Sequence, residues 1–104
     1  MIAKAYIAAL GIAQIKFFQD ACEKNNLEAI IMENENNIID ELRLKKPDLL
    51  FIQASIIEKF KTNIISYIKE DEELGDIFIV VHASRENGAE FAYKVGADRF
   101  LAVP

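Results

Sequence analysis

Short runs of apolar residues alternate along the chain with longer amphipathic segments, and this alternation limits the possible folds more than any other feature. We expect strands at residues 4–10, 27–32, 48–53, 77–81 and 99–103. Between them, apolar side chains recur at helical spacing over residues 13–24, 37–45, 57–69 and 87–95. The order βαβαβαβαβ predicts one α/β domain over residues 1–104, with helices on both faces of a parallel sheet.

The central strands and several helix ends have specific sequence signals. The third and fourth strands contain unbroken apolar runs, which are typical of strands buried on both faces. Asn25 and Asn26 indicate the end of the first helix, Pro47 the end of the second, and Gly96 the end of the last. We therefore expect four side chains at the centre of the core: Leu50, Ile52, Ile79 and Val81.

Composition excludes several classes of function. The net charge of -5 argues against a nucleic-acid-binding protein, which needs a basic surface. The one cysteine, Cys22, cannot form an internal disulfide or a multi-cysteine metal site, and it fits a reducing compartment. No stretch approaches the roughly 20 apolar residues of a membrane span. We expect a cytoplasmic protein with no contact to nucleic acid or membrane.

Three segments carry a resemblance to a known family. They are Lys46–Ile52 before and within the third strand, Asp71–Ile77 before the fourth, and Gly96–Leu101 with Pro104 at the fifth. In these segments the sequence resembles the receiver domains of bacterial two-component response regulators. The resemblance implies a flavodoxin-like (CheY-like) three-layer sandwich with strand order 2-1-3-4-5. It also implies that the first helix covers one sheet face and that the next three cover the other. The family's usual fifth helix would begin at Pro104, where this sequence stops, so we expect that helix to be lacking.

The positions that carry the family's chemistry do not match. The resemblance places Ala9 and Leu10 where receivers have an acidic pair that holds magnesium, and Gln53 at the phosphoacceptor aspartate. Val103 replaces a lysine. Ala83, with Ser84 next to it, aligns with a threonine or serine. Magnesium prefers carboxylate ligands, and phosphoryl transfer needs a nucleophile and cations. We therefore expect a non-catalytic pseudo-receiver without a cofactor or metal.

The expected function is protein binding. Phe100 occupies the position of the family's switch aromatic, which relays phosphorylation to the protein surface. Without phosphorylation the relay has no input, so Phe100 is either a fixed part of an interface or a core residue. We expect a signalling or scaffolding domain that binds a protein partner or itself, as part of a larger regulatory protein.

A small-ligand binding module or an enzyme of flavodoxin-like fold is the alternative. It would use the carboxyl ends of the strands near Leu10, Gln53 and His82, with Ser84 as a further polar group. A lone histidine is more simply a structural residue, and Cys22 on the apolar side of a helix is more simply a small hydrophobe.

Two further segments have an ordinary structural interpretation. Residues 84–88 favour a helix cap over an anion-binding loop, because serine and asparagine are common N-cap residues. The acidic residues 70–73 favour a solvated helix end.

An uncovered sheet face follows from the lack of a fifth helix. The first helix, with Phe17, Phe18 and Cys22, would share this face with the first and fifth strands. We expect an exposed apolar patch of roughly several hundred Å², at the limit for a soluble monomer. A second copy forming a two-fold dimer is the expected cover, with a longer natural chain or another protein as alternatives.

Overall fold

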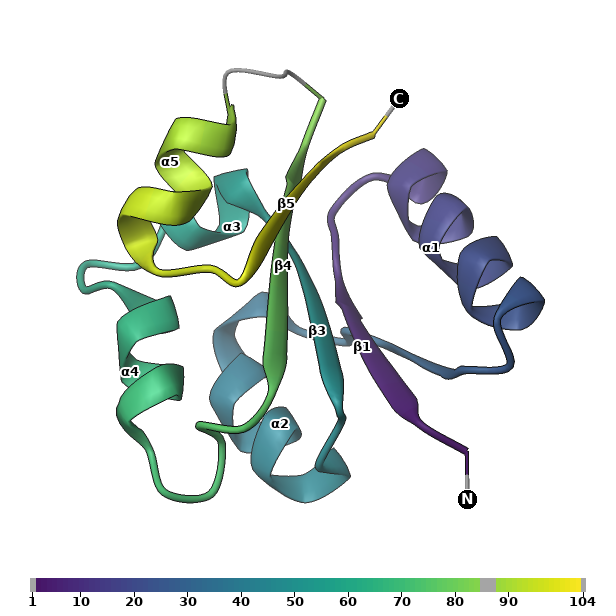
Figure 1. The fold of residues 1–104 in the computed structure, drawn as a ribbon, viewed down its shortest axis with the longest axis horizontal. Helices are drawn as coiled ribbons and strands as arrows, with labels where there is room; N and C mark the ends of the chain where they lie inside the picture. Colours follow the sequence, from purple (N-terminus) through teal and green to yellow (C-terminus); the bar gives the residue numbers. More distant parts are fainter. Residues whose placement is uncertain (1, 85–87, 104) are drawn as a thin grey trace.

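Five parallel strands form one sheet in the predicted order β2-β1-β3-β4-β5. The protein is described by a computed structural model that covers residues 2–84 and 88–103. Figure 1 shows the strands running side by side through the middle of the molecule. Their bounds are Lys4–Ala8 (β1), Glu28–Ile31 (β2), Leu49–Gln53 (β3), Phe78–Ala83 (β4) and Arg99–Ala102 (β5).

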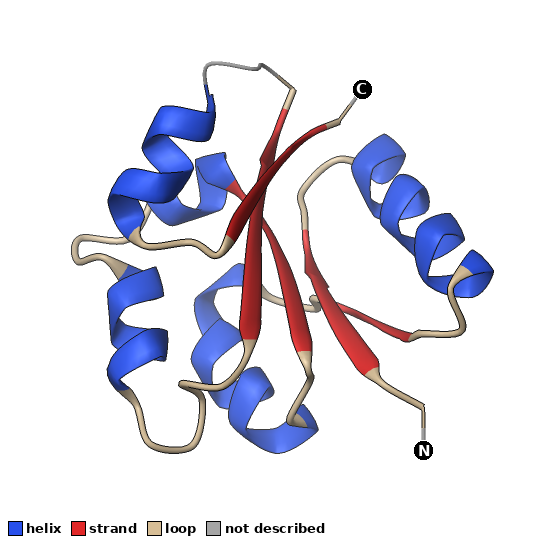
Figure 2. Ribbon diagram, in the orientation of Figure 1, coloured by secondary structure: helices blue, strands red, loops and turns tan. Residues whose placement is uncertain are grey.

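The helices cover the two faces of the sheet unequally, as predicted. Figures 1 and 2 show α1 alone on one face and α2 to α5 on the other. No helix in the described ranges is long and apolar enough to cross a membrane. The helix bounds are Ile12–Lys24 (α1), Glu35–Asn37 (the 3-10 helix η1), Ile38–Lys45 (α2), Ala54–Glu58 (α3), Ile64–Glu70 (α4) and Gly88–Val95 (α5).

The prediction of one continuous helix over residues 57–69 is wrong. The chain forms α3 and α4 instead, separated by a turn at residues 59–63. Asn63 starts α4 as its N-cap, because its Oδ1 accepts hydrogen bonds from the backbone N–H groups of Ile65 and Ser66. Because two helices, α3 and α4, replace the one expected helix, the helix expected at residues 87–95 is α5. No helix follows β5 in the described part of the chain.

The larger part of the core lies between the sheet and the helices α2 to α5. The four side chains predicted for its centre are fully buried, each with 0% exposure: Leu50, Ile52, Ile79 and Val81. Burial of both faces of β3 and β4 explains their unbroken apolar runs. On these two strands only Phe78, at the start of β4, is exposed.

A second, smaller apolar cluster lies between α1 and the opposite face of the sheet. Phe18 is its centre, with its ring stacked on Phe51 at 4.6 Å between centroids and against His82 at 4.5 Å. Cys22 is buried one turn further along α1, as predicted for a small hydrophobe. We call this group the α1-side cluster; its buried members are Ala5, Ile7, Ala9, Phe18, Cys22 and Val103.

Three connections that leave helices adopt the left-handed backbone conformation. Asn26 after α1 has φ 56°, Lys46 after α2 has φ 51°, and Gly96 after α5 has φ 102°. Asparagine and glycine adopt this conformation at low cost, which confirms the predicted ends of α1 and α5. Lys46 ends α2 immediately before Pro47.

Candidate functional site

The carboxyl ends of the strands gather at one edge of the sheet, because all five strands are parallel. This edge is at the top of Figure 1, where α1 begins and α5 begins. The residues that align with receiver chemistry follow these strand ends. Ligands bind at this edge in open α/β sheets, so we take it as the candidate site.

Apolar packing occupies two of the positions that the sequence resemblance aligned with charged residues of receivers. Ala9, which directly follows β1, is 4% exposed, and Val103 after β5 is 3% exposed. Both belong to the α1-side cluster beneath Phe18. Placing a carboxylate or an ammonium group there would bury a charge without a partner, which is costly. These two positions therefore support packing and offer no ligand to a magnesium ion.

Gln53 at the end of β3 has a structural partner. Its Oε1 accepts a hydrogen bond of 2.9 Å from the backbone N–H of Leu10. The bond ties the β1–α1 connection to the end of β3, while the Leu10 side chain is exposed to solvent. A neutral amide accepts hydrogen bonds but is not a nucleophile, so Gln53 holds the loop without offering a group for covalent chemistry.

Phe100 packs inward on the side of the larger core. A Cβ atom placed on Gly88 would lie 2.8 Å from Cε1 of Phe100 and 3.2 Å from the Cβ of Ala83. The ring therefore fills the space next to two residues that have little or no side chain. Phe100 is half-buried against the main core, so both interpretations of this residue, core and interface, remain compatible with its position.

A pocket of about 430 Å³ lies at this edge on the side of α3 and α5. Gln53, Ala83 and Ser84 line it, together with Ser55 and Glu58. The hydroxyl of Ser55 is buried there without a hydrogen-bond partner. Residues 85–87 of the expected helix cap lie outside the described residues, so the cap interpretation of residues 84–88 stays a prediction.

His82 lies apart from this pocket, on the other face of the sheet. It is fully buried against Phe18, and neither ring nitrogen has a hydrogen-bond partner of normal geometry. Burial lowers the pKa of His82 from 6.5 to about 4, although the nearby Ala8 backbone offsets part of this effect. The imidazole is therefore neutral at pH 7 and does not converge with Ser84 on one ligand site.

Two of the segments that carry the receiver resemblance have structural roles. Asp98 accepts hydrogen bonds from the backbone N–H of Ile79 at 2.8 Å and from the Lys69 ammonium. Partial burial opposes ionisation of Asp98, but these two donors outweigh it and lower its pKa. Asp48 similarly accepts a 2.8 Å hydrogen bond from the Lys4 backbone N–H. Both aspartates join neighbouring elements at the amino-terminal edge of the sheet, opposite the candidate site.

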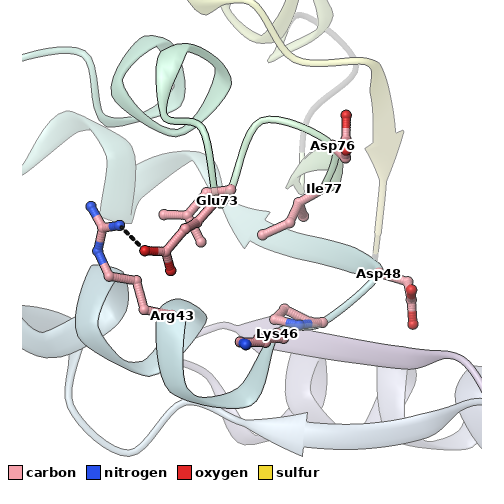
Figure 3. Close-up of a pocket in the computed structure, with 8 residues that line it drawn as sticks. Arg43, Lys46, Asp48, Glu73, Asp76 and Ile77 are labelled. Carbon is pink, nitrogen blue, oxygen red and sulfur yellow. Dashed lines mark ion pairs between the residues drawn. The ribbon is translucent and has the colours of Figure 1, made fainter.

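A second pocket, of about 470 Å³, lies at this opposite edge. Arg43 borders it and pairs with Glu73 at 3.8 Å and, at 2.9 Å, with Asp71. In Figure 3 the Asp48 and Asp76 side chains point away from the Arg43–Glu73 pair, so the charges do not converge on one point.

The acidic run at residues 70–73 is therefore more than a solvated helix end. Hydrogen bonds from Arg43 lower the pKa of Asp71. Asp71 also accepts hydrogen bonds from the backbone N–H groups of Glu73 and Leu74, which holds the turn after α4.

The described ranges contain no evident centre for metal binding or redox chemistry. No group of three or more histidine, cysteine, aspartate or glutamate residues there is arranged to hold a metal ion. Cys22 is a free thiol inside the α1-side cluster, and burial raises its pKa. A thiol of this kind is mostly protonated and poorly reactive near neutral pH.

Solved receiver structures share this fold over the full length of the chain. No family model matches the sequence, and no curated protein matches it by sequence. The chemotaxis response regulator CheY4 of Vibrio cholerae matches with a TM-score of 0.82 and 10% identity, covering 100% of this chain and 88% of that one. A response regulator from Thermotoga maritima matches at 0.79 and 23% identity, covering 100% and 87%.

A receiver domain from Methylobacillus flagellatus is also similar, with a TM-score of 0.77 and 15% identity, covering 100% of this chain and 88% of that one. The predicted resemblance to receiver domains and the flavodoxin-like fold are thereby confirmed. The TM-scores establish the fold. Because the sequence identities are low, the chemistry must be argued from the residues at the strand ends.

Proposed function

We propose that this receiver-like chain is a non-catalytic regulatory domain that acts by binding protein, and that it is not phosphorylated at the position of Gln53. The observation that carries the proposal is the filled site at the carboxyl ends of β1, β3 and β5. Ala9 and Val103 lie there in apolar packing, and the amide of Gln53 is bonded to the Leu10 backbone.

Phosphoryl transfer at this edge would need three groups that the side chains of Gln53, Ala9 and Val103 do not supply. A carboxylate must attack phosphorus, further carboxylates must hold magnesium, and a cation must neutralise the oxygens of the transferred group. Gln53, Ala9 and Val103 supply none of these. A receiver fold without this chemistry retains its surfaces, so we assign the chain a role in protein binding. Its buried free cysteine suits a reducing compartment, and we place the domain in the cytoplasm.

Beryllofluoride with magnesium, a mimic of the phosphorylated state, is expected to leave the protein unchanged. The measurement is an amide NMR spectrum with and without the two reagents, followed at Gln53, Leu10 and Ser84. A phosphorylatable receiver of known response is the positive control. Stoichiometric labelling by acetyl phosphate, or magnesium-dependent shifts around Gln53, would refute the proposal.

The pocket lined by Gln53, Ser55 and Ser84 supports a second candidate function, a small-ligand binding module. The specific observation in its favour is the buried hydroxyl of Ser55, which has no hydrogen-bond partner. A ligand donor or acceptor would satisfy this group once the Ser55 side chain turned toward the pocket, because its Oγ has no accessible surface in this conformation. His82 is not part of this candidate, because it lies on the other face of the sheet.

We further propose that the uncovered part of the α1-side sheet face pairs with a second copy of the chain. Phe17, Phe78 and Leu101 are each 39–40% exposed, on α1, β4 and β5 respectively. The Arg99 guanidinium lies over the ring of Phe78, 5.9 Å from its centroid. A two-fold axis would bring two such faces together, and each arginine would then lie at the edge of an apolar contact.

Sedimentation equilibrium at micromolar concentration is expected to give a dimer of the isolated chain. Replacing Leu101 with glutamate introduces a charge into the exposed face and is expected to give a monomer, because a charge buried in an apolar contact is costly. Replacing Leu44, which is exposed on α2, with glutamate is the matched control and should leave the dimer intact. A wild-type chain that is monomeric at all concentrations would contradict this pairing.

A further inference from the structure

The break between α3 and α4 leaves two adjoining apolar depressions on the surface. The first, of about 400 Å³, lies between the residues of the break and α5, with Ile57, Phe60, Phe91 and Val95 among its walls. The second, of about 310 Å³, continues from it toward Ile39 and Tyr67. Phe60 and Thr62 line both. We call the two together the α3–α4 groove.

Hydrogen bonds hold the two sides of the groove in place. The Asn63 side chain caps α4 through its Oδ1, and its Nδ2 donates a 2.9 Å hydrogen bond to the carbonyl oxygen of Val95. The start of α4 is thereby joined to the end of α5, and Figure 1 shows the α3–α4 connection passing beside that end. A pre-formed groove loses little conformational entropy when it is filled, which favours binding.

Two lysines without an ion-pair partner in the described ranges border the apolar α3–α4 groove. Lys61 and Lys94 both line the first depression, and neither forms an ion pair with any residue in the described ranges. By contrast, Lys59 pairs with Glu35 and Lys69 pairs with Asp98. Glu58 is the one carboxylate among the residues that line the groove in the described structure. In a chain of net charge -5, two free lysines at one groove select for a negatively charged partner.

We propose that the α3–α4 groove binds a short acidic segment of another protein, which places a large apolar side chain against Phe60 and Phe91 and its carboxylates near Lys61 and Lys94. The apolar contact provides affinity, and the two lysines provide selectivity for acidic over basic segments. This inference rests on the proposed protein-binding function and specifies the chemistry of the partner. It uses a surface distinct from the α1-side face proposed for self-association.

The test titrates the full chain with a short capped peptide of glutamates that contains one phenylalanine and one leucine, followed by amide NMR. We expect shifts confined to the residues that line the groove, at 57–64 and 91–95 and at Ile39 and Tyr67. The same peptide with lysines in place of glutamates should bind at least tenfold more weakly. The double variant Lys61→Glu with Lys94→Glu should also lose at least tenfold in affinity. Both lysines are exposed, so these substitutions should preserve the fold.

A matched control carries the same change in net charge on α1, through Lys16→Glu and Lys24→Glu, and should bind like the wild type. Absence of shifts in the groove with the acidic peptide, equal binding of the lysine peptide, or equal loss in the α1 control would overturn the inference. The beryllofluoride experiment keeps the two proposals separate. If beryllofluoride leaves Gln53 unchanged and the acidic peptide causes no shifts in the groove, only the groove proposal is refuted. If Gln53 responds to beryllofluoride, the proposed function is refuted.

Discussion

Replacing Ile52 with alanine is expected to lower the free energy of unfolding by about 2–5 kcal/mol. Ile52 lies on β3, paired with Ala8 of β1 on one side and Val81 of β4 on the other, and it has no exposed surface. Removing its terminal carbons takes away apolar burial and leaves a cavity. Strands on both sides prevent the backbone from closing that cavity, so the loss should be close to the full cost of the missing contacts.

Urea unfolding followed by circular dichroism measures this loss. Ile12→Ala is the matched control, because the side chain of Ile12 at the start of α1 is 85% exposed. The control should change the free energy of unfolding by less than about 0.5 kcal/mol. A loss well under about 1 kcal/mol for both Ile52→Ala and Leu50→Ala would mean that β3 is not the packed centre of the sheet.

Acidification from pH 6.5 to pH 4 is expected to cost the protein about 3 kcal/mol of stability through His82 alone. The folded pKa of His82 is about 4, whereas an unfolded chain has the ordinary value of about 6.5. Between these values the unfolded state binds a proton that the folded state excludes. Stability is therefore fully present above pH 6.5 and is lost as the pH falls toward 4.

The variant His82→Leu separates this effect from other acid-sensitive groups. It replaces the imidazole with an apolar side chain of similar size, so its free energy of unfolding should be nearly constant between pH 6.5 and 4. Asp71 and Asp98, whose pKa values are lowered, lose their contribution only at more acid pH, as protons bind to the folded state. The same pH dependence in wild type and variant would show that His82 is not the responsible group.

Strand positions and layer order were predictable because they depend on the apolar pattern of each segment. Unbroken runs predicted the doubly buried β3 and β4, and the alternation with helical segments predicted the parallel sheet. Gly96 and Asn26 predicted helix ends because few other residues adopt positive φ at low cost. The strand order itself came from the resemblance to receivers, since the apolar pattern does not specify which strands are neighbours.

The break between α3 and α4 was missed because apolar spacing does not report backbone continuity. Ile57, Phe60, Ile64 and Ile68 repeat at helical spacing although the helix ends between them. One signal of the break was present in the sequence. Asn63, two positions before Ile65, is a residue type that commonly begins a helix as its N-cap. Burial of Ile57, Ile64 and Ile68 against the same core preserves the pattern across the interruption.

The candidate site was predictable in its positions and unpredictable in its contacts. Alignment with the receiver pattern placed Ala9, Gln53 and Val103 at one edge of the sheet. The hydrogen bond from Leu10 to Gln53 and the pairing of Lys69 with Asp98 join residues far apart in the sequence, and no local pattern encodes them. The unpartnered burial of His82 was equally hidden, because it depends on where the Phe18 ring packs.

The unequal cover of the two sheet faces has a consequence for how the molecule opens. A single helix, α1, closes the smaller cluster, whereas α2 to α5 share the larger one. Fewer buried contacts hold α1, so its detachment costs less free energy than separation of the opposite layer. In such local opening, α1 would detach while the strands and the other helices stay folded. Cys22 and His82 would then be transiently exposed. Local opening of α1, more than global unfolding, would then govern how fast reagents reach these two side chains.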